Sequence, residues 1–358
     1  MGLRVMVMAG GTGGHVFPAL AVADELSSRG AEVFWLGACN SFESRVVPEH
    51  GYVVEAISIK GLRGNGALGW LAAPFNIALA MYQAMKIVRR KRPGLVLGLG
   101  GFVTGPGGLV ARVMGIPLVI HEQNSVPGMT NRWLSRVATK VIEAFPGSFP
   151  AKRQALVTGN PVRSEIADLP EPAERLNRGE GALRLLVLGG SQGALALNEN
   201  LPGALAKIDS ELRPQVRHQA GRDKVAFTET LYRKAGVEAD VSAFVEDMAE
   251  AYGWADLVVC RAGALTVAEL AAAGVGSILV PYPHAVDDHQ TLNARYLSDS
   301  GAALLMPQSE LDAESLSLHL QKLCRDRAEI QKMASIARNL ALPEATAKVA
   351  DICQEVAG

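Results

Sequence analysis

Short apolar runs alternate with longer helical patterns along the chain. Because these runs show no polar alternation, they predict strands buried on both faces, as in a parallel sheet covered by helices. The predicted strands are 4–8, 32–36, 53–57, 95–99, 118–121, 140–143 and 155–158 in the first half, and 184–188, 216–219, 241–244, 257–260, 277–280 and 303–306 in the second. Helical patterns cover 19–29, 76–92 and the tail 311–357. The predicted fold class is therefore α/β.

The two halves of the chain begin alike. Residues 3–14 (LRVMVMAGGTGG) and 183–193 (LRLLVLGGSQG) each combine an apolar strand, a glycine turn with a hydroxyl and the start of a helix. A charged, proline-rich stretch at 161–181 separates them and indicates an interdomain linker with a short helix. The simplest architecture is two Rossmann-like, doubly wound parallel-sheet domains that face each other across a cleft, with ligands at the carboxyl ends of the strands.

Composition narrows the class of protein. The chain has 358 residues and a net charge of −1. It therefore lacks the excess positive charge that would indicate a nucleic-acid partner. Its cysteines (Cys39, Cys260, Cys324 and Cys353) are far apart and lack CxxC spacing, which indicates reduced thiols. The apolar run at 5–8 is too short for a signal peptide, and no clean run of ~20 apolar residues predicts a membrane span.

Two glycine-rich turns follow strands of the first half. The turn at 10–15 (GGTGGH) lets the backbone curl around a phosphate, and the helix that follows directs free N–H groups at the anion. A nicotinamide or flavin fingerprint is the alternative, but Val16 breaks its spacing and no acid follows the second strand. A second turn lies within 99–108 (LGGFVTGPGG). Both turns are predicted to contact one phosphorylated ligand.

Polar residues gather at a strand end and at the domain junction. The motif HEQN at 121–124 ends an apolar strand, where polar side chains are costly to bury without partners. Arg163, in the motif GNPVR, has a planar guanidinium that suits a diphosphate. The turn at 189–193 (GGSQG) repeats the phosphate-binding pattern of the first half.

Two further motifs lie in the second half. Residues 260–269 (CRAGALTVAE) combine a strand end, a glycine turn and a helix start. Glu269 there either complements the helix dipole or accepts hydrogen bonds from a ribose diol. His284 and the segment 287–293 (DDHQTLN) bring acids and histidines together, but without the spacing of a zinc site. We therefore predict no metal site and no cofactor.

These motifs resemble, in order from Met8 to about Ala294, the UDP-GlcNAc:undecaprenyl-diphosphoryl-MurNAc-pentapeptide N-acetylglucosaminyltransferases of glycosyltransferase family 28 in the GT-B superfamily. The resemblance rests on GGTGGH, HEQN, GNPVR, GGSQG, GALTVAE and HQxxNA. It implies a GT-B fold with an acceptor- and membrane-side domain at 1–162, a donor domain at 163–340, and a C-terminal helix, about 341–358, that packs back on the first domain. It also implies an inverting, metal-independent enzyme that moves GlcNAc from UDP-GlcNAc to the C4 hydroxyl of MurNAc in lipid I, giving lipid II for peptidoglycan synthesis.

The resemblance assigns residues to the UDP-GlcNAc donor. Arg163 and Ser191 face its diphosphate, the turn at 264–266 offers backbone N–H groups, and Glu269 takes the ribose hydroxyls. Val245 borders the uracil, while Gln290 and Asn124 address the GlcNAc. The implied donor-binding set is Thr12, Gly13, Gly14, Asn124, Arg163, Ser191, Val245, Ala264, Leu265, Thr266, Val267, Ala268, Glu269 and Gln290. Because some relatives carry glutamine in place of His289, no contact is assigned to that residue.

The acceptor side of the reaction needs a diphosphate site and a general base. The diphosphate residues implied by the resemblance are Gly11, Gly101, Thr104 and Gly105. A general base speeds such a transfer by about 10²–10⁴-fold. His15 is the first candidate, because imidazole titrates near neutrality. Its alternative role is a contact to the acceptor phosphate, in which case Glu122 is the second candidate for the base.

An apolar segment at 67–82 raises the question of a membrane. Asn65, Pro74, Asn76 and Gln83 argue against a span, and a packed core helix with a basic end is one interpretation. A polyprenyl-linked acceptor favours the other, an interfacial patch on an anionic membrane surface. The predicted patch consists of Trp70, Leu71, Phe75, Leu79, Lys86, Arg89 and Arg90. We then expect a peripheral protein on the cytoplasmic face of the bacterial inner membrane, with other cell-wall and division proteins among its partners.

Two other functions fit part of the pattern. A UDP-GlcNAc 2-epimerase shares the architecture and the nucleotide but needs no lipid acceptor. A non-catalytic nucleotide-sugar binding protein would bind UDP-GlcNAc without turnover, and the density of polar groups at the strand ends argues against it.

Overall fold

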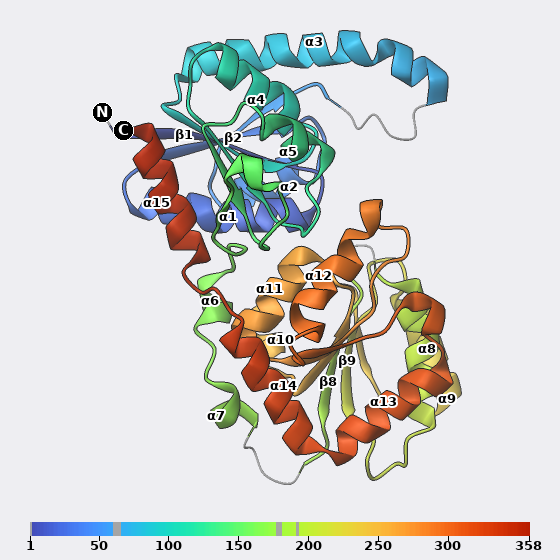
Figure 1. The fold of residues 1–358 in the computed structure, drawn as a ribbon. Coiled ribbons are helices and arrows are strands. Elements are labelled where there is room, and N and C mark those ends of the chain that lie inside the picture. Colours follow the sequence, from blue (N-terminus) through green and yellow to red (C-terminus); the bar gives the residue numbers. More distant parts are fainter. Residues whose placement is uncertain (1, 60–65, 177–180, 191–192) are drawn as a thin grey trace. The chain divides into compact units, whose positions relative to one another are not determined.

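The structure, a computed structural model, describes residues 2–59, 66–176, 181–190 and 193–358, with the backbone alone for 66–72 and Val286. The chain divides into two units (Figure 1). Unit 1 comprises Met1–Val162 and Leu342–Gly358, and unit 2 comprises Arg163–Ala341. Each unit carries one sheet in which every strand pair is parallel. The predicted α/β class with two parallel sheets is therefore confirmed.

Unit 1 contains a 7-stranded sheet in the order β3-β2-β1-β4-β5-β6-β7. Its strands are β1 (Arg4–Ala9), β2 (Glu32–Ala38), β3 (Val54–Ile57), β4 (Leu95–Gly100), β5 (Leu118–Glu122), β6 (Lys140–Glu143) and β7 (Leu156–Val157). The strand order reverses between β1 and β4. The loops after these two strands diverge at such a reversal, which is where open α/β sheets bind their ligands.

Helices cover both faces of this sheet. They are α1 (Gly13–Ser28), α2 (Glu43–Glu49), α3 (Gly66–Lys91), α4 (Thr104–Val113), α5 (Met129–Leu134), the 3₁₀ helix η1 (Ala151–Arg153) and the C-terminal α15 (Ala345–Ala357). Val5 and Val7 of β1 pack with α1 and α15, while Met6 and Met8 pack with α3, α4 and α5 on the other face. Because successive side chains of a strand point to opposite faces, a strand covered on both sides needs an uninterrupted apolar run.

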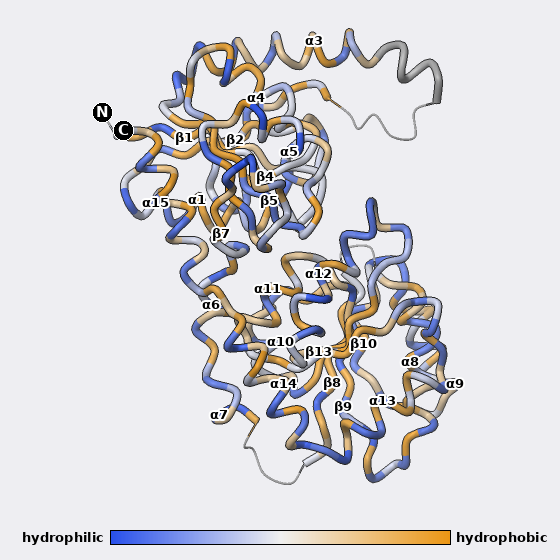
Figure 2. Tube along the Cα trace, viewed as in Figure 1, coloured by the Kyte–Doolittle hydropathy of each residue, from blue (hydrophilic) through white to orange (hydrophobic). Residues whose placement is uncertain are grey.

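Unit 2 contains a 6-stranded sheet in the order β10-β9-β8-β11-β12-β13. Its strands are β8 (Arg184–Leu188), β9 (Gln215–Gln219), β10 (Asp240–Ser242), β11 (Leu257–Cys260), β12 (Gly276–Leu279) and β13 (Ala303–Leu305). Its helices are α6 (Ser164–Ala167), α7 (Pro172–Leu176), α8 (Leu195–Ala206), α9 (Val225–Ala235), α10 (Met248–Trp254), α11 (Ala264–Ala273), η2 (Val286–Asp288), α12 (His289–Ser298), η3 (Gln308–Glu310), α13 (Ala313–Arg325) and α14 (Arg327–Asn339). Figure 2 shows hydrophobic stretches along strands such as β8 and β13, as burial of the sheet requires.

Two helices begin earlier than the apolar pattern predicts. α1 starts at Gly13, within the glycine turn, and α4 includes Gly105 to Gly108, where the sequence indicated a loop. The glycines of α4 serve close packing, because a Cβ on Gly108 would lie 2.8 Å from Leu134 Cδ1. A larger residue would require Leu134 to shift, so glycine, usually a helix breaker, suits this position. The stretch predicted as a linker with one short helix carries two, α6 and α7.

Two buried histidines predict acid sensitivity in both units. Burial lowers the pKa of His121, in unit 1, to about 4 and that of His218, in unit 2, to about 3. The unfolded chain takes up these protons near pH 6.5, so the stability of each unit is full above about pH 6.5 and falls as the pH drops toward the folded-state values. At pH 5 we expect each unit to lose about 2 kcal/mol relative to pH 7.5. Urea denaturation at the two pH values measures this loss, and identical midpoints would contradict it.

Candidate functional site

The glycine turns after β1 and β4 lie against each other in unit 1. Gly10 N donates to Gly100 O over 3.3 Å. Gly101 adopts φ +89°, and a Cβ at this position would lie 2.5 Å from Gly10 O. Only glycine permits this approach. The two turns thus form one backbone surface at the strand ends, which is what a shared phosphorylated ligand requires.

A buried carboxylate that no motif pointed to holds the first turn in place. Glu43 of α2 is 1% exposed. Its Oε2 accepts from Gly11 N and its Oε1 from Ala38 N, each over 3.0 Å. Gly11 therefore has no N–H left for the acceptor diphosphate that the resemblance assigned to it. A dinucleotide-binding fingerprint has an acidic residue after the second strand that binds a ribose. Glu43 follows that strand, but its carboxylate binds backbone N–H groups of the protein.

The N-terminus of α1 opens beside these turns. Thr12 is its N-cap residue, and the N–H groups of His15 and Val16 both bond to Thr12 O. Gly13 and Gly14 come before them, so their N–H groups have no partner within the helix. Such groups attract phosphate at a helix N-terminus. Thr12 and Gly14 are exposed, which leaves this end of α1 open to an anion.

Thr104, predicted to contact the acceptor diphosphate, turns its side chain inward. The residue is 0% exposed, and its Oγ1 donates to Gly100 O over 2.7 Å. The hydroxyl thereby stabilises the β4 turn and cannot reach a ligand. Only the backbone N–H groups of Thr104 and Gly105, in the first turn of α4, remain for an anion.

His15 lies over the β4 turn and is held by Gln123. A Cβ on Gly100 would lie 3.0 Å from the His15 ring, so glycine is needed beneath the imidazole. His15 Nδ1 is 2.6 Å from Gln123 Oε1. The amide nitrogen of Gln123 lies 3.0 Å from His121 Nδ1 and donates to His121 O, also over 3.0 Å. The half-buried His15 makes no bond through Nε2 to any residue that the structure describes. That nitrogen is available to a substrate.

Glu122, the second candidate for the base, has both carboxylate oxygens engaged. The residue is 1% exposed. Its Oε1 accepts from the N and Nδ2 of Asn124 over 3.0 and 3.1 Å, and its Oε2 accepts from Gly128 N and Asn131 Nδ2 over 3.0 Å each. These donors stabilise the charge and fix the loop that follows β5. A buried carboxylate with four donors is poorly placed to take a substrate proton, so the geometry favours His15.

In unit 2 the predicted donor turn is the start of α11. Gly263 is the N-cap residue, and Val267 N is the first to bond within the helix, to Gly263 O over 2.9 Å. The N–H groups of Leu265 and Thr266 thus have no helical partner and can face a phosphate. Val267 differs, because its N–H is used and its side chain is 0% exposed. Ala264 is also buried, so it too can contribute through its backbone alone.

Glu269, Arg163 and Tyr252 form a cluster next to this turn. Glu269 Oε1 lies 3.0 Å from Arg163 Nη2, and Tyr252 OH donates to Oε2 over 3.1 Å. The Glu269 side chain is 6% exposed and that of Arg163 is 35% exposed. Burial raises the pKa of Glu269, while Arg163 and Tyr252 oppose that rise. Each carboxylate oxygen can accept a second hydrogen bond, so the cluster is compatible with the predicted contact to a ribose.

The other predicted donor residues of unit 2 lie on separate elements outside this cluster. Val245 follows β10 and, with Phe244, lines a cavity of about 190 Å³. Gln290 lies in the first turn of α12, and its Oε1 accepts from Tyr282 N over 2.8 Å. Ala268 is half-buried on α11. Ser191 lies outside the described residues.

Metal-binding side chains are not grouped in the described part of the chain, where no three or more His, Cys, Asp or Glu residues could hold an ion together. Of the four cysteines, Cys39 is exposed and the others are buried. Burial raises the pKa of Cys324 to about 11 and that of Cys353 to about 12, as expected for unreactive structural thiols.

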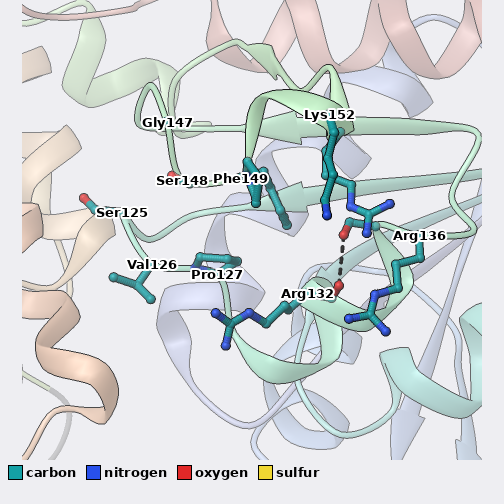
Figure 3. Close-up of a pocket in the computed structure, with 12 residues that line it drawn as sticks. Ser125, Val126, Pro127, Arg132, Arg136, Gly147, Ser148, Phe149 and Lys152 are labelled. Atoms are coloured by element: carbon teal, nitrogen blue, oxygen red, sulfur yellow. Dashed lines mark hydrogen bonds between the residues drawn. The ribbon is translucent and has the colours of Figure 1, made fainter.

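A cationic pocket, drawn in Figure 3, lies in unit 1 beside the loop that follows β5. Its volume is about 420 Å³, and its walls come from residues 125–127, α5 and the segment 147–153. Its charged lining residues are Arg132, Arg136, Lys152 and Arg153. No carboxylate lines the pocket, and none of these cations forms an ion pair with a described residue. Cationic side chains gathered around a cavity attract an anion.

Residues 5–143 match the model of the glycosyltransferase family 28 N-terminal domain, and residues 184–356 match that of the family 28 C-terminal domain. These matches, together with the two parallel-sheet units, show a GT-B glycosyltransferase. The chain belongs to glycosyltransferase family 28.

Individual relatives extend over the whole chain. The UDP-N-acetylglucosamine--N-acetylmuramyl-(pentapeptide) pyrophosphoryl-undecaprenol N-acetylglucosamine transferase of Methylococcus capsulatus is 53% identical over 359 residues, covering 100% of both chains. The crystal structure of Acinetobacter baumannii MurG superimposes with a TM-score of 0.85 at 44% identity, covering 99% of each chain. A UDP-N-acetylglucosamine 2-epimerase has a TM-score of 0.66 at 14% identity over 98% of this chain and 95% of its own, a likeness of fold alone.

Proposed function

We propose that this chain is the N-acetylglucosaminyltransferase that moves GlcNAc from UDP-GlcNAc to the MurNAc of lipid I, forming lipid II for peptidoglycan synthesis. Full-length relatives at 53% identity carry this activity in their names. The observation that carries the chemistry is the unengaged Nε2 of His15, which lies beside two glycine turns suited to phosphate.

The reaction is a single displacement. The C4 oxygen of MurNAc attacks the anomeric carbon of GlcNAc, and its proton passes to His15 Nε2. The bond between the anomeric carbon and the UDP oxygen breaks, and its electron pair leaves with UDP. Attack opposite the leaving group converts the α-linked donor into a β-linked product. A base so placed contributes about 10²–10⁴-fold to the rate.

The departing UDP needs its negative charge stabilised. The free N–H groups of Leu265 and Thr266 and the guanidinium of Arg163 supply this stabilisation, so that no metal ion is required. When the donor binds, Arg163 shares its contact between Glu269 and the diphosphate, and Glu269 accepts the ribose hydroxyls. Tyr252 holds the Glu269 carboxylate in place during this exchange.

The acceptor diphosphate is held by helix N-termini of unit 1. The N–H groups of Thr104 and Gly105 on α4 provide this site, and those of Gly13 and Gly14 on α1, which the resemblance assigns to the donor, can also face an anion here. Gly101 keeps the two turns in contact. Glu122 contributes indirectly in this scheme, because its hydrogen bonds shape the loop that carries Asn124.

Transfer of labelled GlcNAc from UDP-GlcNAc to a short-chain lipid I analogue, with EDTA present, tests the proposal. A disaccharide-lipid product supports it. Formation of the 2-epimer from UDP-GlcNAc alone would indicate the epimerase instead. Tight binding of UDP-GlcNAc without either product would indicate a non-catalytic binding protein.

An apolar surface on unit 1 suits the lipid-linked acceptor. Phe75 and Leu79 of α3 are 74% and 39% exposed, Val113 of α4 is 73% exposed, and Trp133 of α5 is 59% exposed. α4 packs against both α3 and α5, so these side chains belong to neighbouring helices. The described helices include none that is long and apolar enough to cross a membrane.

The basic residues of α3 flank this surface. Lys86 and Arg89 are exposed, whereas Arg90 forms an ion pair with Glu55 over 2.5 Å and so contributes less positive charge than expected. The side chains of Trp70 and Leu71 lie outside the described residues. We propose that this surface places the enzyme on the anionic, cytoplasmic face of the inner membrane as a peripheral protein, where other cell-wall and division proteins are candidate partners.

Replacing both Phe75 and Val113 by serine should lower partition onto anionic phospholipid vesicles by about tenfold or more, because two exposed apolar side chains no longer enter the interface. Vesicle sedimentation measures the partition. Phe227→Ser is the matched control, since Phe227 is 45% exposed on α9 of unit 2. Equal losses in the two variants would show that this surface does not bind the membrane.

A further inference from the structure

The hydrogen bonds around His15 form a directed chain. His121 Nε2 lies 3.0 Å from Gly159 O. A carbonyl oxygen can only accept, so His121 carries its hydrogen on Nε2 and its Nδ1 must accept. Gln123 faces both Nδ1 and the carbonyl oxygen of His121 over 3.0 Å, which requires its NH₂ group on that side.

The orientation of Gln123 then fixes the tautomer of His15. With its NH₂ group turned to His121, Gln123 presents Oε1 to His15 Nδ1 over 2.6 Å. Oε1 can only accept, so His15 carries its hydrogen on Nδ1 and the lone pair of the neutral ring lies on Nε2. Gln123 and His121 are 1% and 0% exposed, so water does not compete for these bonds.

We propose that Gln123 and His121 are positioning residues that hold His15 in the Nδ1–H tautomer and so direct its Nε2 lone pair at the acceptor hydroxyl; the catalytic meaning of this arrangement rests on the proposed function. Burial keeps the pKa of His121 at about 4, so His121 stays neutral and its donor–acceptor pattern does not change near neutral pH. After His15 takes the proton, its Nδ1–H bond to Gln123 remains and helps to stabilise the cation.

Nitrogen-15 NMR of histidine-labelled protein at pH 8 tests the tautomer without any turnover. The signal lost in His15→Ala is expected to show the Nδ1–H pattern in the wild type and a mixture of tautomers in Gln123→Leu. An Nε2–H pattern in the wild type would overturn the proposal. Because this readout needs no substrate, its failure is distinct from a failure of the transfer reaction.

The kinetics of two Gln123 variants give a second readout. Gln123→Leu should lower kcat by about 10- to 100-fold, by analogy with the residues that orient metal-bound histidines, with KM for UDP-GlcNAc nearly unchanged. Gln123→Glu still accepts from His15 Nδ1 and adds a negative charge, so it should restore much of kcat and move the acid limb of the pH profile to higher pH. Equal losses and unchanged pH profiles in both variants would mean that Gln123 acts only through the fold.

The cationic pocket carries a second, independent inference. It adjoins the loop that holds His15: Ser148, in the pocket wall, donates to Asn124 O over 3.0 Å. Ser125, also in the wall, is two residues from Gln123 and thus within about 7 Å of it along the backbone. An anion in the pocket would therefore lie near the reacting acceptor.

We infer that this pocket binds carboxylate groups of the acceptor's peptide, an inference that rests on the proposed function. MurNAc carries its peptide through the lactyl ether at C3, one carbon from the C4 hydroxyl that reacts. The peptide must consequently leave the site close to His15, and five extended residues span about 17 Å. A peptide brings at least its C-terminal carboxylate, which arginine and lysine bind with charge-assisted hydrogen bonds. Arg132 and Lys152 come from different walls of the pocket (Figure 3).

The double variant Arg132→Gln, Lys152→Gln tests this pocket with two acceptors. KM for the pentapeptide acceptor should rise about tenfold or more, whereas KM for an acceptor without peptide should stay within about twofold. The matched control is Arg45→Gln, which neutralises an exposed cation on α2.

Other outcomes overturn the assignment. Equal changes with both acceptors, or no change, would exclude peptide binding, and lost binding to anionic vesicles with unchanged KM values would assign the pocket to a lipid headgroup. If the wild type uses neither acceptor, the transfer function fails. Calorimetry with the free pentapeptide then tests the pocket by itself, and no heat of binding would reject it.

Discussion

His15→Ala is expected to lower kcat by about 10²–10⁴-fold while KM for UDP-GlcNAc changes little. The imidazole lies at the strand ends of unit 1 with its Nε2 unengaged by any described residue, whereas the residues predicted for ribose and uracil belong to unit 2. Its removal should therefore affect the proton transfer more than binding of the donor. Initial rates with both substrates varied give kcat and each KM separately.

His50→Ala is a suitable control, because His50 is exposed at the end of α2 in the same unit. A loss in His15→Ala confined to the KM of the lipid acceptor would assign His15 to the acceptor phosphate. The base would then have to be sought elsewhere, and Glu122 would return as a candidate despite its four hydrogen bonds.

Glu269→Ala should both destabilise unit 2 and weaken donor binding. The carboxylate is the partner of Arg163 and of the buried Tyr252 hydroxyl, and its loss removes both this ion pair and this hydrogen bond. Removing one member of a buried ion pair costs about 3–5 kcal/mol, and the partial exposure of Arg163 reduces this to about 2 kcal/mol. KM for UDP-GlcNAc should rise at least tenfold, since the ribose loses its acceptor.

Denaturant unfolding and donor titration separate these two effects. Asp209→Ala removes the exposed ion pair of Asp209 with Arg325 and should cost only about 0–1 kcal/mol. Glu269→Gln keeps the shape and one acceptor oxygen, so it should recover stability more than donor affinity. A Glu269→Ala protein with wild-type KM would remove Glu269 from the donor site.

Much of the fold could be predicted because buried parallel strands leave a strong signal. β1 and β8 were evident from apolar runs that end in glycine turns, and their partners followed the same pattern. The start of α1 and the whole of α4 were not evident, because glycine and proline usually interrupt helices. Their glycines allow close packing, as at Gly108 against Leu134, and such a contact is visible only in three dimensions.

The candidate site could be predicted in its motifs but not in its connections. His15, Glu122 and Glu269 could be selected by residue type and by their place at strand or helix ends. The hydrogen bonds of Gln123 to His15 and of Glu43 to the first glycine turn could not be predicted from the sequence. Those bonds link elements far apart in the chain. The inward-facing hydroxyl of Thr104 was hidden for the same reason, since burial depends on the fold and not on the motif.

A direct displacement driven by one side-chain base is tested most directly by the stereochemistry of the product formed in EDTA. The new bond between GlcNAc and the C4 oxygen of MurNAc can be assigned by proton NMR from the coupling of the anomeric hydrogen. A β linkage at an undiminished rate is the result predicted by attack opposite the leaving group, with Arg163 and the start of α11 stabilising UDP. An α linkage, or a reaction that stops without a divalent metal, would contradict the mechanism.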